Sequence, residues 1–415
     1  MKANYHKVSV WLLFFSFMLV TISLTKTNPS HEEVVNKLRI GIGLITIALL
    51  FFDIIFTIIV GRLSKTRLYI LLLGFFLLSY ATIGSFIYGG VRYFLDNPEL
   101  VVLIFISIIF LWASSAVGGE ISFNEIDKFF RKFIPLYCFA TLFITIYFGG
   151  LSLSFPPKFI FNELGINSYS QGISKLYMIA SLLSLISFIK EKKKRFMLVS
   201  FFFLCASFLG GARGDFAIGF ILYSFIIMSY NKKLGIYLIL ITAIISSLSF
   251  INLSDLSEKF YIVNRFLQLD SSNLGQRDVL ARQAIALLDR DSFCMISGCG
   301  FNAFQYFWNY RVGLYPHNIM IESFITLGFP IASVVILSYL YGLLKSIQTK
   351  MILNGFVIIG VYLVAIGMKS GTIIDLTLVS FVLNMIITTI FKNNIADNHN
   401  QDPSTPSVNK KSYIH

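Results

Sequence analysis

The chain has 415 residues, of which 56% are hydrophobic and only 13% are charged. Soluble globular domains carry about 25% charged residues, so this composition excludes an ordinary soluble protein. The net charge of +13 would suit a nucleic-acid-binding protein, but the basic residues do not gather in one patch, and we expect no nucleic-acid partner.

Apolar runs recur along the whole chain, each close to the roughly 20 residues that a helix needs to cross a bilayer. They predict an all-α polytopic integral membrane protein with about twelve transmembrane helices. The first run is longer than the core of a signal peptide, so we interpret it as a retained span. The predicted spans are 8–24, 40–60, 68–88, 100–117, 133–150, 172–189, 196–211, 216–230, 234–252, 318–344, 351–368 and 372–391.

The basic residues favour one side of the predicted bundle. With a cytoplasmic N-terminus, twenty Lys and Arg residues fall in cytoplasmic segments and eight in short outer loops and helix ends. This ratio follows the positive-inside rule and predicts that both termini are cytoplasmic. Residues 1–392 then form one helical membrane domain, and residues 393–415 form a polar tail that we expect to be disordered.

The same topology places one long polar segment, residues 253–317, on the outer face. Loops of this length inside a compact domain are usually functional. Residues 276–290 predict a short amphipathic helix, because their leucines and alanines recur on one helical face. Guanidinium groups bind phosphate bidentately, so the arginines of the segment suit a lipid that carries a diphosphate; the alternative is a solvated helix with internal salt bridges. These arginines are Arg265, Arg277, Arg282, Arg290 and Arg311.

The four cysteines do not form a disulfide framework. Cys138 and Cys205 lie in predicted spans and are interpreted as small core residues. Cys294 and Cys299 lie in the outer segment, where oxidation is possible, and the sequence leaves their bonding open. The glycines on either side of Cys299 indicate a turn.

The outer segment ends in Tyr-Pro-His-Asn, residues 315–318. Pro316 disfavours a helix at the residue before it, so His317 or Asn318 is predicted to be the N-cap of the next span. A helix N-terminus attracts anions and keeps an imidazole neutral, which suits a general base. The alternative is a histidine that merely caps the helix.

Other ionisable residues lie at or inside the predicted spans. Arg213 follows two glycines at an outer break between spans, where it would place a cation at the membrane rim; a hairpin arginine that reaches the lipid headgroups is the alternative. Glu322 lies about one turn into the tenth span, and intramembrane charges are functional hypotheses by default. Asp53 is a weaker candidate, and Lys369 is placed to pair with Asp375.

The order of these features resembles the O-antigen polymerase and O-antigen ligase superfamily. The resemblance consists of about twelve spans, the Gly-Gly-x-Arg-Gly break at residues 210–214, and an arginine-bearing helix in a long outer loop. That loop continues into Gly298-x-Gly300-x-x-x-Phe304 and ends in Pro316-His317-Asn318-x-x-x-Glu322-x-x-x-x-x-Gly328. The topology covers nearly the whole chain, and the residue-level resemblance covers about residues 205–330.

The resemblance implies a metal-independent glycosyltransferase of GT-C-like architecture, without a cofactor, in the bacterial inner membrane with its active face in the periplasm. Its donor would be an undecaprenyl-diphosphate-linked oligosaccharide, and its partners would be membrane lipid and a chain-length regulator protein. Carried over to this sequence, Arg213 and Arg277 would hold the diphosphate, and His317, with Glu322, would orient or deprotonate the acceptor hydroxyl. Secondary substrate contacts are expected from Arg265, Arg282, Arg311 and Asn318.

Within this resemblance, the wording Tyr-Pro-His-Asn-x-x-x-Glu and the rather short loop favour a polymerase, which joins repeat units. A ligase, which transfers the finished glycan to lipid A-core, is the alternative. A lipid-linked oligosaccharide flippase is a second alternative of another class. Transporters usually show internal repeats and charges along a central cavity, whereas here the polar residues are concentrated on one predicted face.

Overall fold

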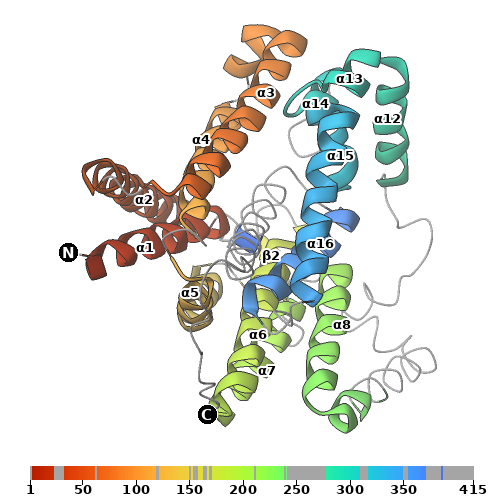
Figure 1. Ribbon diagram of the computed structural model, residues 1–415. Helices are drawn as coiled ribbons and strands as arrows, with labels where there is room; N and C mark the ends of the chain where they lie inside the picture. Colours follow the sequence, from red (N-terminus) through yellow and green to blue (C-terminus); the bar gives the residue numbers. More distant parts are fainter. Residues whose placement is uncertain are drawn as a thin grey trace, which may run out of the picture.

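The computed structural model describes part of the chain and shows a bundle of long helices (Figure 1). The helices are α1 (Lys2–Thr21), α2 (Glu32–Val60), α3 (Lys65–Asp96), α4 (Pro98–Ser115), α5 (Phe123–Phe148), α6 (Gln171–Glu191), α7 (Lys194–Leu209), α8 (Arg213–Tyr230), α12 (Arg277–Arg290), α13 (Ser292–Ser297), α14 (Ala303–Phe307), α15 (Ile319–Gln348) and α16 (Gly355–Ser370). The described residues are 2–22, 32–60, 63–96, 98–117, 121–148, 151–152, 158–161, 166–167, 171–209, 212–237, 240, 277–308, 316–348, 354–370 and 385–386.

Five of these helices are long and apolar enough to cross a membrane: Glu32–Ile59, Lys65–Gly89, Phe123–Phe148, Gln171–Glu191 and Ile319–Gln348. The fold is therefore that of a helical membrane protein. Ten of the predicted spans coincide with helices of the described ranges. The predicted spans 234–252 and 372–391 lie almost wholly outside those ranges, as do the tail 393–415 and Asp375, so the count of twelve stays a prediction.

Three short strands depart from the prediction of an all-α chain. They are β1 (Leu151–Ser152), β2 (Lys158–Phe161) and β3 (Ile166–Asn167), which pair in the order β1-β2-β3 with both pairs antiparallel. They lie between α5 and α6, where the helical ladder stops and the backbone groups need other partners. A two-residue strand has too little sequence pattern to be predicted.

The core of the bundle is centred on α6, which is buried on nearly all sides. Serines let α6 and α7 approach closely: the Ser181 hydroxyl donates to the Ser200 carbonyl at 2.9 Å, and the Ser200 hydroxyl donates to the Ser181 carbonyl at 2.8 Å. Small residues at helix contacts are typical of membrane bundles, because they allow close backbone approach and interhelical hydrogen bonds.

A buried polar cluster joins the first four helices and accounts for Asp53. The Asp53 carboxylate accepts hydrogen bonds from the Ser9 hydroxyl, from the Arg67 guanidinium at 3.0 Å and from the Trp112 indole at 2.8 Å. Arg67 also donates to the Ser115 hydroxyl at 3.2 Å. Asp53 and Arg67 are both fully buried, and a buried ion pair is tolerated only when such additional hydrogen bonds satisfy it. The structure therefore gives Asp53 a structural role.

A second polar cluster is centred on Asp127 and ties α5 to α6 and to the start of α16. The Asp127 carboxylate accepts from Arg131 at 2.9 Å, from Lys190 at 2.9 Å and from the Gly355 amide at 2.7 Å. A side chain on Gly355 would meet the Asp127 carboxylate at 2.7 Å. Arg131 and Lys190 are residues that the positive-inside count places at the cytoplasmic end.

Breaking the first cluster should cost the protein much of its stability. In Asp53→Ala the buried Arg67 loses its carboxylate, which typically costs about 3–5 kcal/mol. We expect a clearly lower thermal unfolding midpoint for the protein purified in detergent. The matched control is Glu33→Ala, which removes an ion pair with Lys37 whose side chains are 74% and 78% exposed, and which should cost less than about 1 kcal/mol. Equal midpoints for both variants would contradict this assignment.

Candidate functional site

The start of α15 has the predicted N-cap, and the cap is Asn318. Its side-chain oxygen accepts from the amides of Met320 at 2.9 Å and Ile321 at 3.3 Å. His317, the residue before the cap, has a φ of 57°, a left-handed conformation that histidine tolerates better than bulky residues. The His317 side chain is partly exposed and follows the buried Pro316. His317 therefore lies at the first turn of α15, as the sequence predicts.

The start of α15 is tied to the end of α16. The Asn318 side-chain amide donates to the Met368 carbonyl at 3.0 Å. Both polar atoms of Asn318 thus serve the backbone, which gives this residue a structural role alongside its predicted one in substrate binding. We call this end of the bundle the His317 end.

The end of α16 is tied in turn to the start of α8. The Lys369 ammonium donates to the Asp215 carboxylate at 3.0 Å, and Asp215 is fully buried. Lys369 reaches it by passing directly over Gly214, where an added Cβ would lie 2.1 Å from the Lys369 nitrogen. The final glycine of Gly-Gly-x-Arg-Gly therefore makes room for this ion pair. The backbone of Arg213 consequently lies at the His317 end.

Two buried carboxylates at this end each keep one oxygen without a hydrogen-bond partner among the described residues. They are Oε2 of Glu322, which is 4% exposed, and Oδ2 of Asp215. Leaving a buried acceptor unsatisfied costs about 1–3 kcal/mol, and more for a charged group. Such groups are rare in membrane bundles and are functional hypotheses by default.

A turn from the outer segment enters a break in α15. Gly328 is non-helical, with φ 74° and ψ 158°, and Pro330 has no amide to donate to the Thr326 carbonyl. The carbonyls freed there accept hydrogen bonds from the turn: the Cys299 amide donates to Ile325 at 2.7 Å, and the Gly300 amide donates to Thr326 at 3.2 Å. We call residues 297–301 the glycine turn.

The other side of the glycine turn contacts α3. The Tyr80 hydroxyl donates to the Ser297 carbonyl at 2.7 Å, and the Phe301 amide donates to the Ser85 hydroxyl at 2.7 Å. A Cβ on Gly300 would lie 2.2 Å from the Ser85 backbone nitrogen, and Gly300 has a φ of 82°. Only glycine satisfies both conditions, so the Gly-x-Gly of the sequence serves packing.

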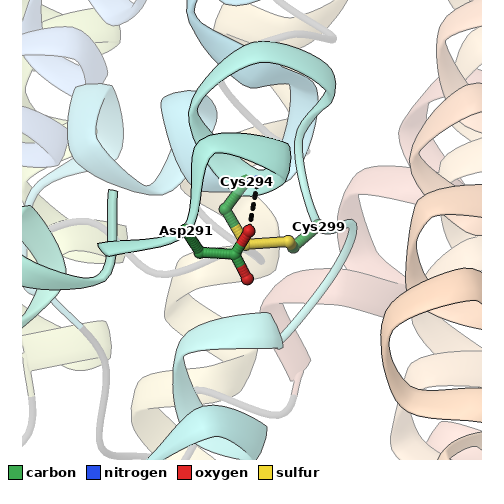
Figure 2. Close-up of side chains that lie close together, drawn as sticks. All are labelled: Asp291, Cys294 and Cys299. Atoms are coloured by element: carbon green, nitrogen blue, oxygen red, sulfur yellow. Dashed lines mark hydrogen bonds between the residues drawn. A yellow bond between two sulfur atoms is a disulfide. The ribbon is translucent and has the colours of Figure 1, made fainter. Parts of the chain in front are cut away.

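A disulfide between Cys294 and Cys299 closes the loop that carries the glycine turn (Figure 2). The Asp291 carboxylate beside it accepts from the amides of Phe293 at 3.0 Å and Cys294 at 3.2 Å, and so caps α13. Together the three residues have the donor atoms of a metal site, but the sulfurs are bonded to each other and the carboxylate serves as a helix cap. We therefore interpret this group as a covalent clip, which for a loop of this length contributes about 2 kcal/mol of stability.

The predicted amphipathic helix is α12, and it packs as its pattern indicates. Leu280, Ala284 and Leu287 are buried in one small core with Cys294 and Ile325. Arg277 opens the helix and Arg282 is exposed. Figure 1 shows α12, α13 and α14 beside α15.

The structure places the predicted site residues unevenly. His317 and Asn318 directly precede α15, and Glu322 lies in its first turn, while the backbones of Arg213 and Arg277 open α8 and α12. The side chains of Arg213 and Arg277, and all of Arg265 and Arg311, lie outside the described residues. Whether the guanidinium groups converge on the imidazole therefore stays a prediction.

Sequence reasoning did not assign a packing role to three residues that build this end of the bundle. Asp215 is two residues from Arg213, but its partner Lys369 is 154 positions away; the predicted pair of Lys369 with Asp375 lies outside the described residues. Ser85 and Gly328 interrupt apolar runs, which is the signal that could have drawn attention to them.

Comparison of the sequence with protein-family models and with curated proteins gives no match.

The ion pair between α16 and α8 should be needed for stability. Lys369→Met leaves Asp215 buried without its cation, and we expect a loss of about 3 kcal/mol in unfolding free energy. Adding Asp215→Asn should restore part of that loss, because the amide carries no charge. Thermal midpoints of the wild type, both single variants and the double variant form the test; additive effects would show that the two side chains do not interact.

The glycine turn should tolerate no side chain at position 300. Gly300→Ala forces a Cβ into the Ser85 backbone at a positive φ, with an expected cost of at least about 2 kcal/mol. The matched control is Gly41→Ala, because a Cβ there meets nothing within 4 Å, and a helical alanine should be neutral or stabilising by up to about 1 kcal/mol. The thermal midpoints of the two variants are compared, and a Gly300→Ala protein as stable as Gly41→Ala would refute the packing described.

Proposed function

We propose that the protein is a metal-independent membrane glycosyltransferase, and more specifically an O-antigen polymerase. It would join undecaprenyl-diphosphate-linked repeat units at the periplasmic face of the inner membrane. One observation carries the proposal: the helix starts that bear Arg213 and His317 lie at the same end of the bundle, linked through Lys369–Asp215 and Asn318–Met368. The resemblance to O-antigen polymerases assigns the diphosphate and the acceptor to these two helix starts.

The start of α8 is suited to an anion. Its N-cap is Ala212, whose side chain forms no capping hydrogen bond, and the acidic residue of its first turn, Asp215, is paired with Lys369. A helix N-terminus carries partial positive charge, and Arg213 adds a permanent cation at the first position. These features support binding of a lipid diphosphate there.

The reaction needs few chemical groups from the protein. The acceptor hydroxyl oxygen attacks the anomeric carbon of the donor sugar, the bond from that carbon to the diphosphate oxygen breaks, and undecaprenyl diphosphate leaves with the electron pair. Negative charge grows on the leaving group, so fixed cations from Arg213 and Arg277 would stabilise the transition state more than the ground state. The hydroxyl proton would pass to His317.

Glu322 supports this arrangement from inside the bundle. It lies five residues after His317, it is buried, and its Oε2 has no hydrogen-bond partner among the described residues. A carboxylate in that position can orient the acceptor hydroxyl or stabilise an imidazolium as it forms.

Removing either proposed group should stop glycan extension. We expect Arg213→Ala and His317→Ala to lower extension by about 10²-fold or more, the usual effect of losing one transition-state contact. Arg213→Lys should keep part of the activity, because it keeps the charge but loses the two-pronged contact with phosphate. The measurement is a lipopolysaccharide gel from a strain that lacks the protein and is complemented with each variant at equal membrane level.

The same gel separates the alternatives. In the strain without the protein, core carrying a single repeat unit indicates a polymerase, bare core indicates a ligase, and lipid-linked units accumulating in the cytoplasm indicate a flippase. The matched control is Arg195→Ala in the first turn of α7, an exposed arginine on the predicted cytoplasmic side, which should leave the glycan unchanged. Normal glycan length from Arg213→Ala or His317→Ala would remove that residue from the mechanism.

A further inference from the structure

We propose that the Cys294–Cys299 disulfide is a positioning device: by holding the glycine turn in the break of α15, it fixes the direction of the helical segment that begins at Asn318. Only the functional part of this proposal, that the segment places catalytic groups, rests on the proposed function. Its structural part concerns the clip, the turn and the two helices that the turn joins.

The break makes the first part of α15 a separate element. Residues 319–327 precede the non-helical Gly328, so the regular ladder does not carry the direction of the rest of α15 across this point. Other contacts must set that direction. Asn318 holds one end to α16 at Met368, and the glycine turn holds the other end at Ile325 and Thr326.

The glycine turn fits both of its partners without space to spare. A Cβ on Gly298 would lie 2.5 Å from the Gly328 nitrogen, and a Cβ on Gly328 would lie 2.3 Å from the Ile296 carbonyl oxygen. On the other side, a Cβ on Gly84 of α3 would lie 3.1 Å from the Gly300 nitrogen. Any shift of the turn therefore displaces α3 or the first part of α15.

The turn cannot hold this conformation by its own sequence. Gly298 and Gly300 both have positive φ, and glycine has more conformational freedom to lose than any other residue. The disulfide restricts the conformations of the turn, because it joins Cys299 to Cys294 on α13. The carboxylate of Asp291 caps α13 and so holds that helix in place. Both cysteines are fully buried against Ile325 and the hydrophobic face of α12. The clip thus preforms the turn that the break in α15 requires.

This arrangement couples the end of α15 that carries His317 and Glu322 to oxidation of the chain. When the disulfide forms, the two thiols lose two protons and two electrons to a disulfide-bearing thiol oxidant, which becomes a dithiol. The predicted topology places the cysteines on the outer face, where such oxidation is possible. The His317 end would therefore be completed only after this segment has left the cytoplasm.

The test is hydrogen exchange on the full-length protein in detergent. We expect Cys294→Ala/Cys299→Ala to speed exchange of the amides of residues 299–301 and 326–329 by about tenfold or more, because the loop-closure constraint is lost. In wild-type protein treated with a phosphine reductant, the molecules whose disulfide is reduced should show the same faster exchange of these amides. The control is Cys138→Ala/Cys205→Ala, which removes the two free thiols of the spans and should leave those amides protected.

A second readout separates positioning from general stability. Leu12→Ala removes a fully buried side chain from α1 and serves as a variant of comparable thermal midpoint that should keep both the protected turn and normal glycan length. The clip variant should shorten the glycan at the same midpoint. Unchanged exchange at the turn, or faster exchange with normal glycan length, would overturn the proposal. If instead Arg213→Ala and His317→Ala both extend glycan normally, the proposed function fails while the exchange data still decide whether the clip positions α15.

Discussion

The fold at the His317 end depends on one interrupted hydrogen-bond ladder. At Gly328 and Pro330 the helix α15 leaves backbone carbonyls without their usual donors. Within a bilayer no water is available to satisfy them, so irregular backbone is tolerated only where protein supplies the partners. The amides of Cys299 and Gly300 supply them here. A segment that the sequence presents as a polar loop is thereby built into the packing of the bundle.

The buried carboxylates of the two polar clusters and those at the His317 end differ in how fully they are hydrogen-bonded. Asp53 and Asp127 each accept three hydrogen bonds, including those from buried cations, and such complete networks hold helices in one register. At the His317 end, Asp215 and Glu322 each keep an oxygen without a hydrogen-bond partner among the described residues. The bundle thus combines two complete charge networks with two buried carboxyl groups that are only partly satisfied.

Local features of this chain could be predicted from the sequence, and long-range pairings could not. The helix α12 follows from the spacing of Leu280, Ala284 and Leu287, and Pro316 restricts the cap of α15 to His317 or Asn318, because both features depend on neighbours along the chain. Lys369 pairs with Asp215, 154 positions earlier in the chain, because α16 packs on α8. The disulfide and the glycine turn likewise depend on contacts among α3, α13 and α15, which the sequence alone does not reveal.

Several residues that carry the resemblance to the polymerase and ligase superfamily have structural roles here. Gly214 makes room for Lys369, Gly298 and Gly328 pack against each other, and Gly300 packs against Ser85 of α3. Asn318 uses both of its polar atoms to hold helix ends. Residues of this kind report on how the helices of this chain pack and carry no chemistry. The case for glycosyl transfer therefore depends on the ionisable members of the pattern, Arg213, Arg277, His317 and Glu322, and on the fact that the packing residues place the helix starts of Arg213 and His317 at one end of the bundle.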